Sequence, residues 1–157
     1  ATSQNTQVPR FFSRTFDPRS LGTDFFKQKF THNGLRLYGN PPFSVVGRVL
    51  DKVRREGLEM LLVVPCWTGQ PWWPLLQTMY TAPPLLLPRA ENTFLPVSTA
   101  NLEGIGLPGW QSLCVQVSGD PVRVQQAQER WGDRLRLIDD QLLPWYFPPK
   151  KPGPGWV

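Results

Sequence analysis

Residues 35–64 have the sequence LRLYGNPPFSVVGRVLDKVRREGLEMLLVV, which holds the clearest structural signals in the chain. Apolar and polar side chains alternate over residues 35–38, as they do along a strand, and Pro41 and Pro42 then end any ladder of backbone hydrogen bonds. Residues 58–64 are mostly apolar and lie between a glycine and a proline, a pattern typical of a buried parallel strand. The stretch therefore predicts a strand, a loop, a helix and a strand, which together form one right-handed βαβ unit.

The helix between these strands is predicted from its two faces. The apolar face holds Val45, Val46, Val49, Leu50 and Val53, and the solvent face holds Arg48, Asp51, Lys52, Arg54 and Arg55. Ser44 is placed to cap the N-terminus, and Gly57 is placed to end the helix. We therefore expect a helix that begins next to the proline pair and shows a basic surface.

The rest of the chain predicts shorter elements. They are helices at residues 74–79 and 121–131, strands at 85–87, 112–117 and 135–138, turns at 17–19 and 21–24, and a glycine-rich loop at 103–109. Prolines recur from residue 143 onward and disfavour regular structure there, so this part is interpreted as a tail.

Composition limits the classes of function. The 157 residues suit one domain, and the net charge of +5 is compatible with nucleic acid or with an acidic protein as partner. The two cysteines, Cys66 and Cys114, are far apart in apolar surroundings, which favours free thiols in a reducing compartment. A single histidine, His32, leaves no metal-binding pattern, so no metal is expected. No apolar run reaches about 18 residues, so no membrane span is expected and an intracellular location is predicted, with nucleus and organelle not distinguished.

Asn40-Pro41-Pro42-Phe43 is the candidate catalytic segment, because it follows a predicted strand at the end where ligands of open α/β sheets bind. The amide oxygen of Asn40 and a proline carbonyl can both accept hydrogen bonds from an exocyclic amine, and the two prolines keep these acceptors in place. The ring of Phe43 can stack on a base that has left the duplex. These groups suit methylation of the adenine amino group, although a plain strand-exit loop would have the same sequence.

The first part of the chain resembles the Dam-like adenine-N6 DNA methyltransferase domain of phages and of DIRS/Ngaro-type retrotransposon polyproteins. The residues that carry this resemblance are Ala1-Thr2-Ser3-Gln4-Asn5, Pro9-Arg10-Phe11-Phe12-Ser13-Arg14, Asp17-Pro18, Leu21-Gly22-Thr23-Asp24, Tyr38, Asn40-Pro41-Pro42-Phe43-Ser44, Arg48-Val49-Leu50, Val63-Val64-Pro65, Trp67 and Gln70-Pro71-Trp72-Trp73. Residues 85–88 and 117–119 match segments that follow this block in the retroelement relatives. The resemblance covers about residues 1–120, which it assigns to a methyltransferase-type domain. The residue patterns beyond it predict a C-terminal helix with a candidate edge strand at 121–142 and a proline-, lysine- and aromatic-rich tail at 143–157.

The resemblance implies an α/β, Rossmann-like, three-layer methyltransferase sandwich. It assigns Asn40, Pro41, Pro42 and Phe43 to the target base, and Asp24 and Asn5 to the cofactor S-adenosylmethionine. In the family, a short central strand with an acidic residue directly precedes the position of Ala1, and we expect this chain to lack it. The resemblance therefore implies a fold that is incomplete at its N-terminal strand.

Nucleic-acid contacts are also predicted on the basic helix and the tryptophans. Arg48, Lys52 and Arg55 would bind phosphates, and Trp72 and Trp73 would stack on bases, although a solvated helix face and ordinary core packing explain the same patterns. An RNase H-type nuclease is disfavoured, because the carboxylates show no pattern for holding metal.

Two hypotheses remain. The favoured one is a retroelement-derived, methyltransferase-like domain without autonomous catalysis, which acts as a structural or nucleic-acid-contacting component of a larger assembly of protein subunits. The alternative is an active S-adenosylmethionine-dependent adenine methyltransferase that needs upstream sequence.

Overall fold

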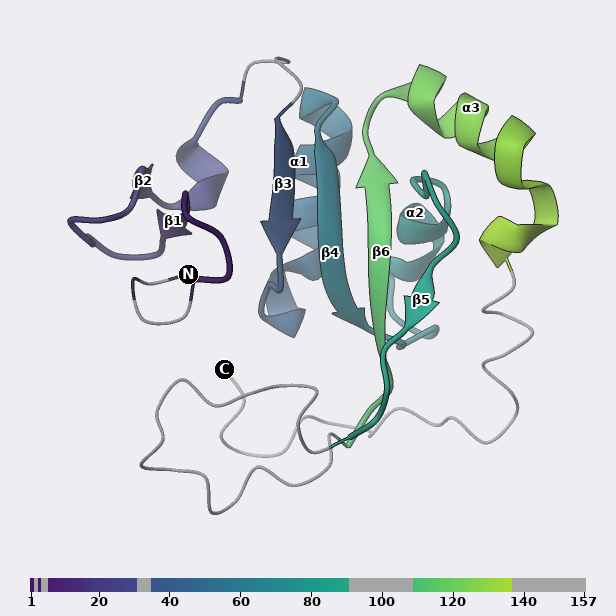
Figure 1. The fold of residues 1–157 in the computed structure, drawn as a ribbon, viewed down its shortest axis with the longest axis horizontal. Coiled ribbons are helices and arrows are strands. Elements are labelled where there is room, and N and C mark those ends of the chain that lie inside the picture. The colour runs from purple at the N-terminus through teal and green to yellow at the C-terminus, as the bar shows by residue number, and fades with distance from the viewer. Residues whose placement is uncertain (2, 4–5, 31–34, 91–108, 137–157) are drawn as a thin grey trace.

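The computed structural model describes residues 1, 3, 6–30, 35–90 and 109–136. Its body is a four-stranded sheet with helices packed against it (Figure 1). The predicted glycine-rich loop lies outside the described residues except for Gly109, and the predicted tail lies outside them entirely.

The predicted βαβ unit is present. Strand β3 (Arg36–Gly39) leads through a short 3₁₀ helix η2 (Phe43–Val45) into helix α1 (Val46–Glu56), and strand β4 (Glu59–Pro65) returns parallel to β3. The prediction that Ser44 caps α1 is wrong, because Ser44 lies inside η2 and the cap position falls on Val45. Gly57 ends the helix as expected, since its φ of 62° lies in the left-handed region that glycine adopts without strain.

The sheet is mixed, with the strand order β3-β4-β6-β5. Strand β6 (Ser112–Ser118) pairs with β4 in the antiparallel sense along its whole length, and β5 (Leu85–Leu86) adds to its other side. The strands predicted at 85–87 and 112–117 are therefore present. Within the described sheet, β3 lies at one edge and has β4 as its neighbour.

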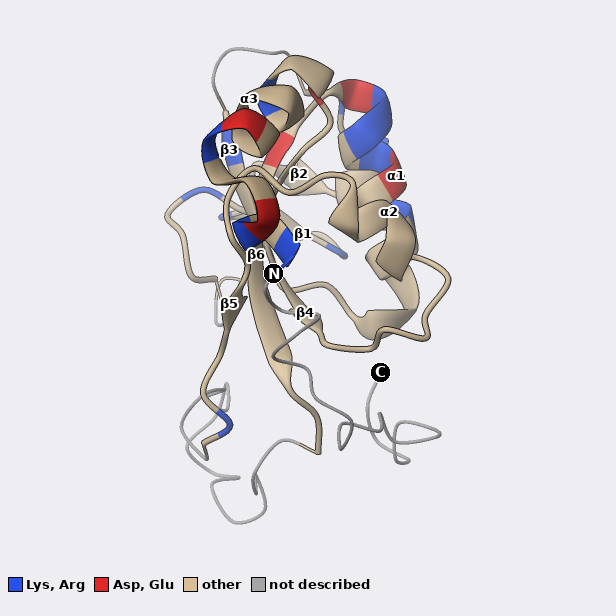
Figure 2. Ribbon diagram, turned by 90° about the vertical axis from the view of Figure 1, so that its right-hand side faces the viewer, with Lys and Arg blue, Asp and Glu red and all other residues tan. Residues whose placement is uncertain are grey.

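The core lies on one face of this sheet. Met60, Leu62 and Val64 of β4 pair with Val117, Val115 and Leu113 of β6, so all six side chains lie on the same face, and all are buried. Helices α1 and α2 (Trp73–Gln77) cover it, whereas α3 (Pro121–Trp131) lies nearer the opposite face (Figure 2) and adds the buried Ala127 to the core cluster. An ion pair between Arg123 of α3 and Glu59 of β4 supports this placement, because Glu59 points away from the core face.

The N-terminal segment forms a separate small unit beyond β3, on the side away from β4 (Figure 1). Strand β1 (Phe12–Ser13) pairs in parallel with β2 (Gly22–Thr23), and the 3₁₀ helix η1 (Phe25–Lys27) follows. The turn predicted at residues 21–24 is therefore wrong at its centre, because Gly22 and Thr23 pair with β1.

The C-terminal part of the described chain begins with α3 as predicted. Asp120 caps this helix, because its carboxylate accepts a hydrogen bond from the Val122 N–H. The strand predicted at 135–138 is wrong in its described half, since residues Gly132–Arg136 form a 3₁₀ helix (η4) in which Leu135 is buried. No helix in the described part of the chain is long and apolar enough to cross a bilayer.

Candidate functional site

Asn40-Pro41-Pro42-Phe43 lies at the carboxyl end of β3, directly before α1. Asn40 and Pro42 are exposed, and Pro41 and Phe43 are half-buried, so the segment lies at the surface. The Pro42 carbonyl accepts a hydrogen bond of 3.0 Å from the Val45 N–H, which closes the first turn of η2. The chain is thus fixed on both sides of the two prolines, by the β3–β4 pairing and by this turn.

The ring of Phe43 contacts two tryptophans. Its centroid lies 4.6 Å from the ring of Trp67 and 5.1 Å from that of Trp110, and both contacts are edge-to-face. Trp67 follows β4, and Trp110 precedes β6, so the loops at this end of the sheet bring the three rings together. We call Phe43, Trp67 and Trp110 the aromatic cluster. Sequence reasoning missed Trp110, because nothing in the local pattern around it indicates contact with Phe43.

The indole N–H of Trp67 is buried and has no hydrogen-bond acceptor among the described residues. A buried donor without an acceptor is costly, which is why tryptophan usually places its N–H near a partner. The aromatic cluster next to Asn40 therefore contains a hydrogen-bond donor that the described part of the protein does not use.

Of the two residues that the resemblance assigns to the cofactor, the structure describes only Asp24. Asn5 lies outside the described residues. Asp24 begins η1, where its carboxylate accepts a hydrogen bond of 3.1 Å from the Phe26 N–H and lies 3.9 Å from the Lys27 ammonium. Asp24 has a φ of 59°, the one positive φ at a non-glycine residue in the described chain. Its carboxylate is therefore fixed by local structure, and its role toward a cofactor stays a prediction.

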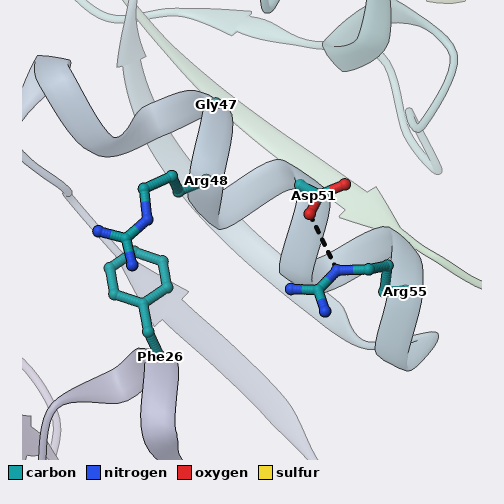
Figure 3. Close-up of a pocket in the computed structure, with 5 residues that line it drawn as sticks. All are labelled: Phe26, Gly47, Arg48, Asp51 and Arg55. Atoms are coloured by element: carbon teal, nitrogen blue, oxygen red, sulfur yellow. Dashed lines mark hydrogen bonds and ion pairs between the residues drawn. The ribbon is translucent and has the colours of Figure 1, made fainter.

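A hollow of about 380 Å³ lies between η1 and the outer face of α1 (Figure 3). It is lined by Phe26, Gly47, Arg48, Asp51 and Arg55. The Arg48 guanidinium lies over the Phe26 ring, 4.1 Å from its centroid, and the Arg55 Nε donates to Asp51 at 2.9 Å. None of the four residues of the candidate catalytic segment lines this hollow.

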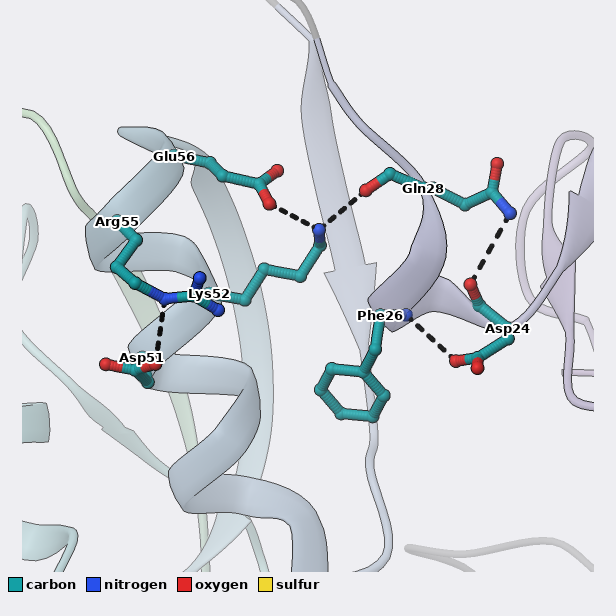
Figure 4. A network of polar contacts seen from close by, with 7 residues as sticks. All are labelled: Asp24, Phe26, Gln28, Asp51, Lys52, Arg55 and Glu56. Carbon is teal, nitrogen blue, oxygen red and sulfur yellow. Dashed lines mark hydrogen bonds and ion pairs between the residues drawn. The ribbon is translucent and has the colours of Figure 1, made fainter.

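Lys52 is buried, contrary to its predicted place on the solvent face. Its side chain is 2% exposed, and its ammonium donates to the Gln28 carbonyl at 2.6 Å and to Glu56 Oε1 at 2.5 Å (Figure 4). The rings of Phe25 and Phe30 lie 5.5 and 5.4 Å from the same nitrogen. The phosphate contact predicted for Lys52 is therefore wrong, because this ammonium is enclosed by the N-terminal segment.

The two tryptophans that were predicted to stack on bases, Trp72 and Trp73, differ in how deeply they are buried. Trp73 is 4% exposed and packs in the core, so its predicted contact with a base is wrong. Trp72 is half-buried, and its side chain lies 3.6 Å from the point where a Cβ on Gly47 would stand. The ordinary explanation, core packing, therefore applies to Trp73.

Neither cysteine forms a disulfide, and Cys66 is buried while Cys114 is half-buried. Burial raises the pKa of the Cys114 thiol and also that of the Tyr38 hydroxyl. No group of three metal-binding side chains occurs within the described ranges.

Comparison with known proteins adds no relative, since no family model, curated protein or solved structure matches this chain.

Proposed function

We propose that this chain is a methyltransferase-like domain of retroelement descent, which contacts nucleic acid as a component of a larger assembly and does not catalyse methyl transfer by itself. The observation that carries the proposal is the position of Asn40-Pro41-Pro42-Phe43. This segment lies at the surface, at the carboxyl end of a strand that pairs in parallel with β4, where open α/β sheets bind their ligands.

The packing of Phe43 favours a domain without autonomous catalysis. An adenine held by Asn40 would need an open ring face for stacking, and the ring of Phe43 already contacts Trp67 and Trp110. The ring therefore helps to hold the corner in shape.

Nucleic-acid contact is supported by the arginines of α1. Arg54 and Arg55 are exposed at its C-terminal end, where Asp51 forms ion pairs with both, and Arg48 is exposed near its beginning. Three arginines and one aspartate leave two positive charges along this face of α1, and a cationic helix face suits the phosphates of a strand.

The alternative is an active S-adenosylmethionine-dependent adenine methyltransferase. It is favoured by the exposure of Asn40 and by the position of β3 at the edge of the described sheet, where a further strand could pair. In that case the added strand would supply the cofactor site, and Asp24 and Asn5 would contribute to it.

Cofactor and oligonucleotide titrations separate the two functions. Under the proposal, calorimetry with S-adenosylmethionine gives no binding heat, while fluorescence anisotropy shows that a labelled oligonucleotide binds with an affinity that falls as salt rises. The double variant Arg48→Gln/Arg55→Gln should lower the slope of log affinity against log salt by roughly 1 to 2, and Arg134→Gln on η4 serves as the control.

The Asn40→Ala variant distinguishes the remaining outcomes. The proposal expects unchanged oligonucleotide affinity and no methyl transfer in either protein. Cofactor binding together with methylation that Asn40→Ala abolishes would establish the alternative. Absence of both cofactor and oligonucleotide binding would eliminate both functions.

A further inference from the structure

We propose that the loop of residues 14–21, which joins β1 to β2, is a contact for an unpaired nucleotide: the ring of Phe16 stacks on the base, and the guanidinium groups of Arg14 and Arg19 bind the flanking phosphates. We call it the Phe16 loop. The inference rests on the proposed function, because it assigns a second element through which the chain contacts nucleic acid. The loop projects from the N-terminal unit, away from the four-stranded sheet (Figure 1).

Phe16 is exposed to an unusual degree. The residue is 84% exposed, more than any other large hydrophobic residue in the described chain, of which the next are Leu85 at 64% and Val122 at 60%. Single exposed apolar residues are common on proteins, so this exposure alone does not indicate a binding site. The structure of the loop around the ring supplies the further evidence.

A polar network fixes the Phe16 loop next to the exposed ring. The Asp17 carboxylate accepts hydrogen bonds from the backbone N–H groups of Ser3 and Arg19, at 2.7 and 3.0 Å. The Asp17 carbonyl accepts from the N–H and the hydroxyl of Ser20, and Ser13, which is buried, bonds to the same hydroxyl at 3.0 Å. The loop backbone that carries the ring is held in this way and loses little conformational freedom on binding, so contact with a partner is favoured.

The charges around Phe16 favour a nucleic-acid strand over a protein surface. Arg14 and Arg19 flank Phe16 in the sequence and are exposed, and neither forms an ion pair with a described acidic residue. The Arg19 guanidinium donates a hydrogen bond of 3.4 Å to the Ser3 carbonyl. The acidic group of the loop, Asp17, directs its oxygens to backbone amides. An exposed aromatic ring in a loop that carries two cations suits a base and its phosphates, whereas an apolar protein site would place further apolar side chains there.

The test uses an oligonucleotide with a central 2-aminopurine, whose fluorescence is quenched when an aromatic ring stacks on it. We expect the wild-type chain to bind the single strand and quench the probe. Phe16→Ala should weaken this binding roughly tenfold, remove the quenching and leave the salt slope unchanged, whereas Phe16→Trp should restore both. Arg14→Gln and Arg19→Gln should each reduce the salt slope by about 0.7.

Val122→Ala, at a similarly exposed apolar position on α3, is the matched control and should bind as the wild type does. Circular dichroism should show that Phe16→Ala remains folded, because little of its ring is buried. If the wild type and Phe16→Ala bind the oligonucleotide equally well, the inference is overturned while the proposed function stands. The exposed Phe16 would then be explained by a protein partner. If the wild type binds no oligonucleotide, both are overturned.

Discussion

Lys52 shows how the surroundings of a single residue decide its role. Its ammonium is enclosed by the Gln28 carbonyl, the Glu56 carboxylate and the rings of Phe25 and Phe30. One oxygen of Glu56 contacts this ammonium, and the other is buried without a hydrogen-bond partner among the described residues. The lysine therefore offsets the cost of burying the carboxylate and connects α1 to the N-terminal segment.

Replacing Lys52 with methionine should lower the free energy of unfolding by about 2 kcal/mol, because the Gln28 carbonyl and the Glu56 carboxylate lose their donor while the apolar stem is kept. The double variant Lys52→Met/Glu56→Gln should recover about half of this loss, since it removes the unpaired charge. Lys27→Met, at a lysine whose side chain is 81% exposed, should change stability by less than about 0.5 kcal/mol. Urea denaturation measures all three, and equal losses for Lys52→Met and Lys27→Met would contradict the role assigned to the buried ammonium.

Asp17 gives a prediction about pH. The backbone N–H groups of Arg19 and Ser3 lower the pKa of its carboxyl, because they donate to the charged form. A lowered pKa in the folded protein means that the stabilisation is complete above the unfolded value of about 3.9 and is lost as the pH falls through the lower folded pKa. The Arg19 amide proton resonance in NMR spectra should therefore shift below about pH 4. A midpoint above 4 would contradict these hydrogen bonds.

At the scale of elements, the turn between β6 and α3 packs closely against the end of α1. A Cβ on Gly119 would lie 2.0 Å from the Val53 carbonyl oxygen and 2.8 Å from the Arg54 Cα, both of which belong to the backbone. The Gly119 N–H also donates to the Leu58 carbonyl at 2.9 Å. Position 119 requires glycine because the atoms that a Cβ would meet are backbone atoms of α1, which cannot move aside as a flexible side chain could.

Gly119→Ala should therefore lower the free energy of unfolding by about 3 kcal/mol, because either α1 or the turn must shift. Gly69→Ala is the control, since a Cβ there would contact nothing within 4 Å, and it should change stability by less than about 0.5 kcal/mol. Thermal denaturation followed by circular dichroism measures both variants. A stable Gly119→Ala protein would show that α1 and the turn are further apart than described.

The sequence predicts the elements whose signals are local. The unit from β3 to β4 was predicted because its apolar positions repeat at strand and helix spacing, and α3 was predicted from Asp120-Pro121 at its start. The cap at Ser44 was wrong because the turn after the prolines tightens into η2 before α1 begins. The sequence predicts a turn that includes residues 22–23, because their pairing with β1 depends on a segment outside the local pattern.

The candidate site was less predictable, because its contacts join distant parts of the chain. Asn40 and the prolines could be placed at a strand end from their neighbours alone. Contact of Phe43 with Trp110 depends on β6 pairing beside β4, and the burial of Lys52 depends on Phe25 and Phe30. Neither contact has a signal in the residues next to it.

At the scale of the whole molecule, the chain is organised as a sheet body and an N-terminal unit joined across η1 and α1. The body takes its stability from the long β4–β6 pairing and the helices on its core face. The described joint includes the buried Lys52, Arg48 stacked on Phe26, and the rings of Phe25 and Phe30, which pack against the core. Each part carries one of the two proposed nucleic-acid surfaces. The N-terminal unit carries the Phe16 loop, and the body carries the arginines of α1.

The edge position of β3 has a consequence for how the protein behaves in concentrated solution. An open strand edge is a template on which another molecule can add a strand, and such additions lead to aggregates. Here the edge is only four residues long, and its first residue, Arg36, carries a charged side chain that is 77% exposed and held near Glu59. If two molecules paired through β3 in parallel and in register, their Arg36 side chains would come together, so this arginine disfavours that pairing.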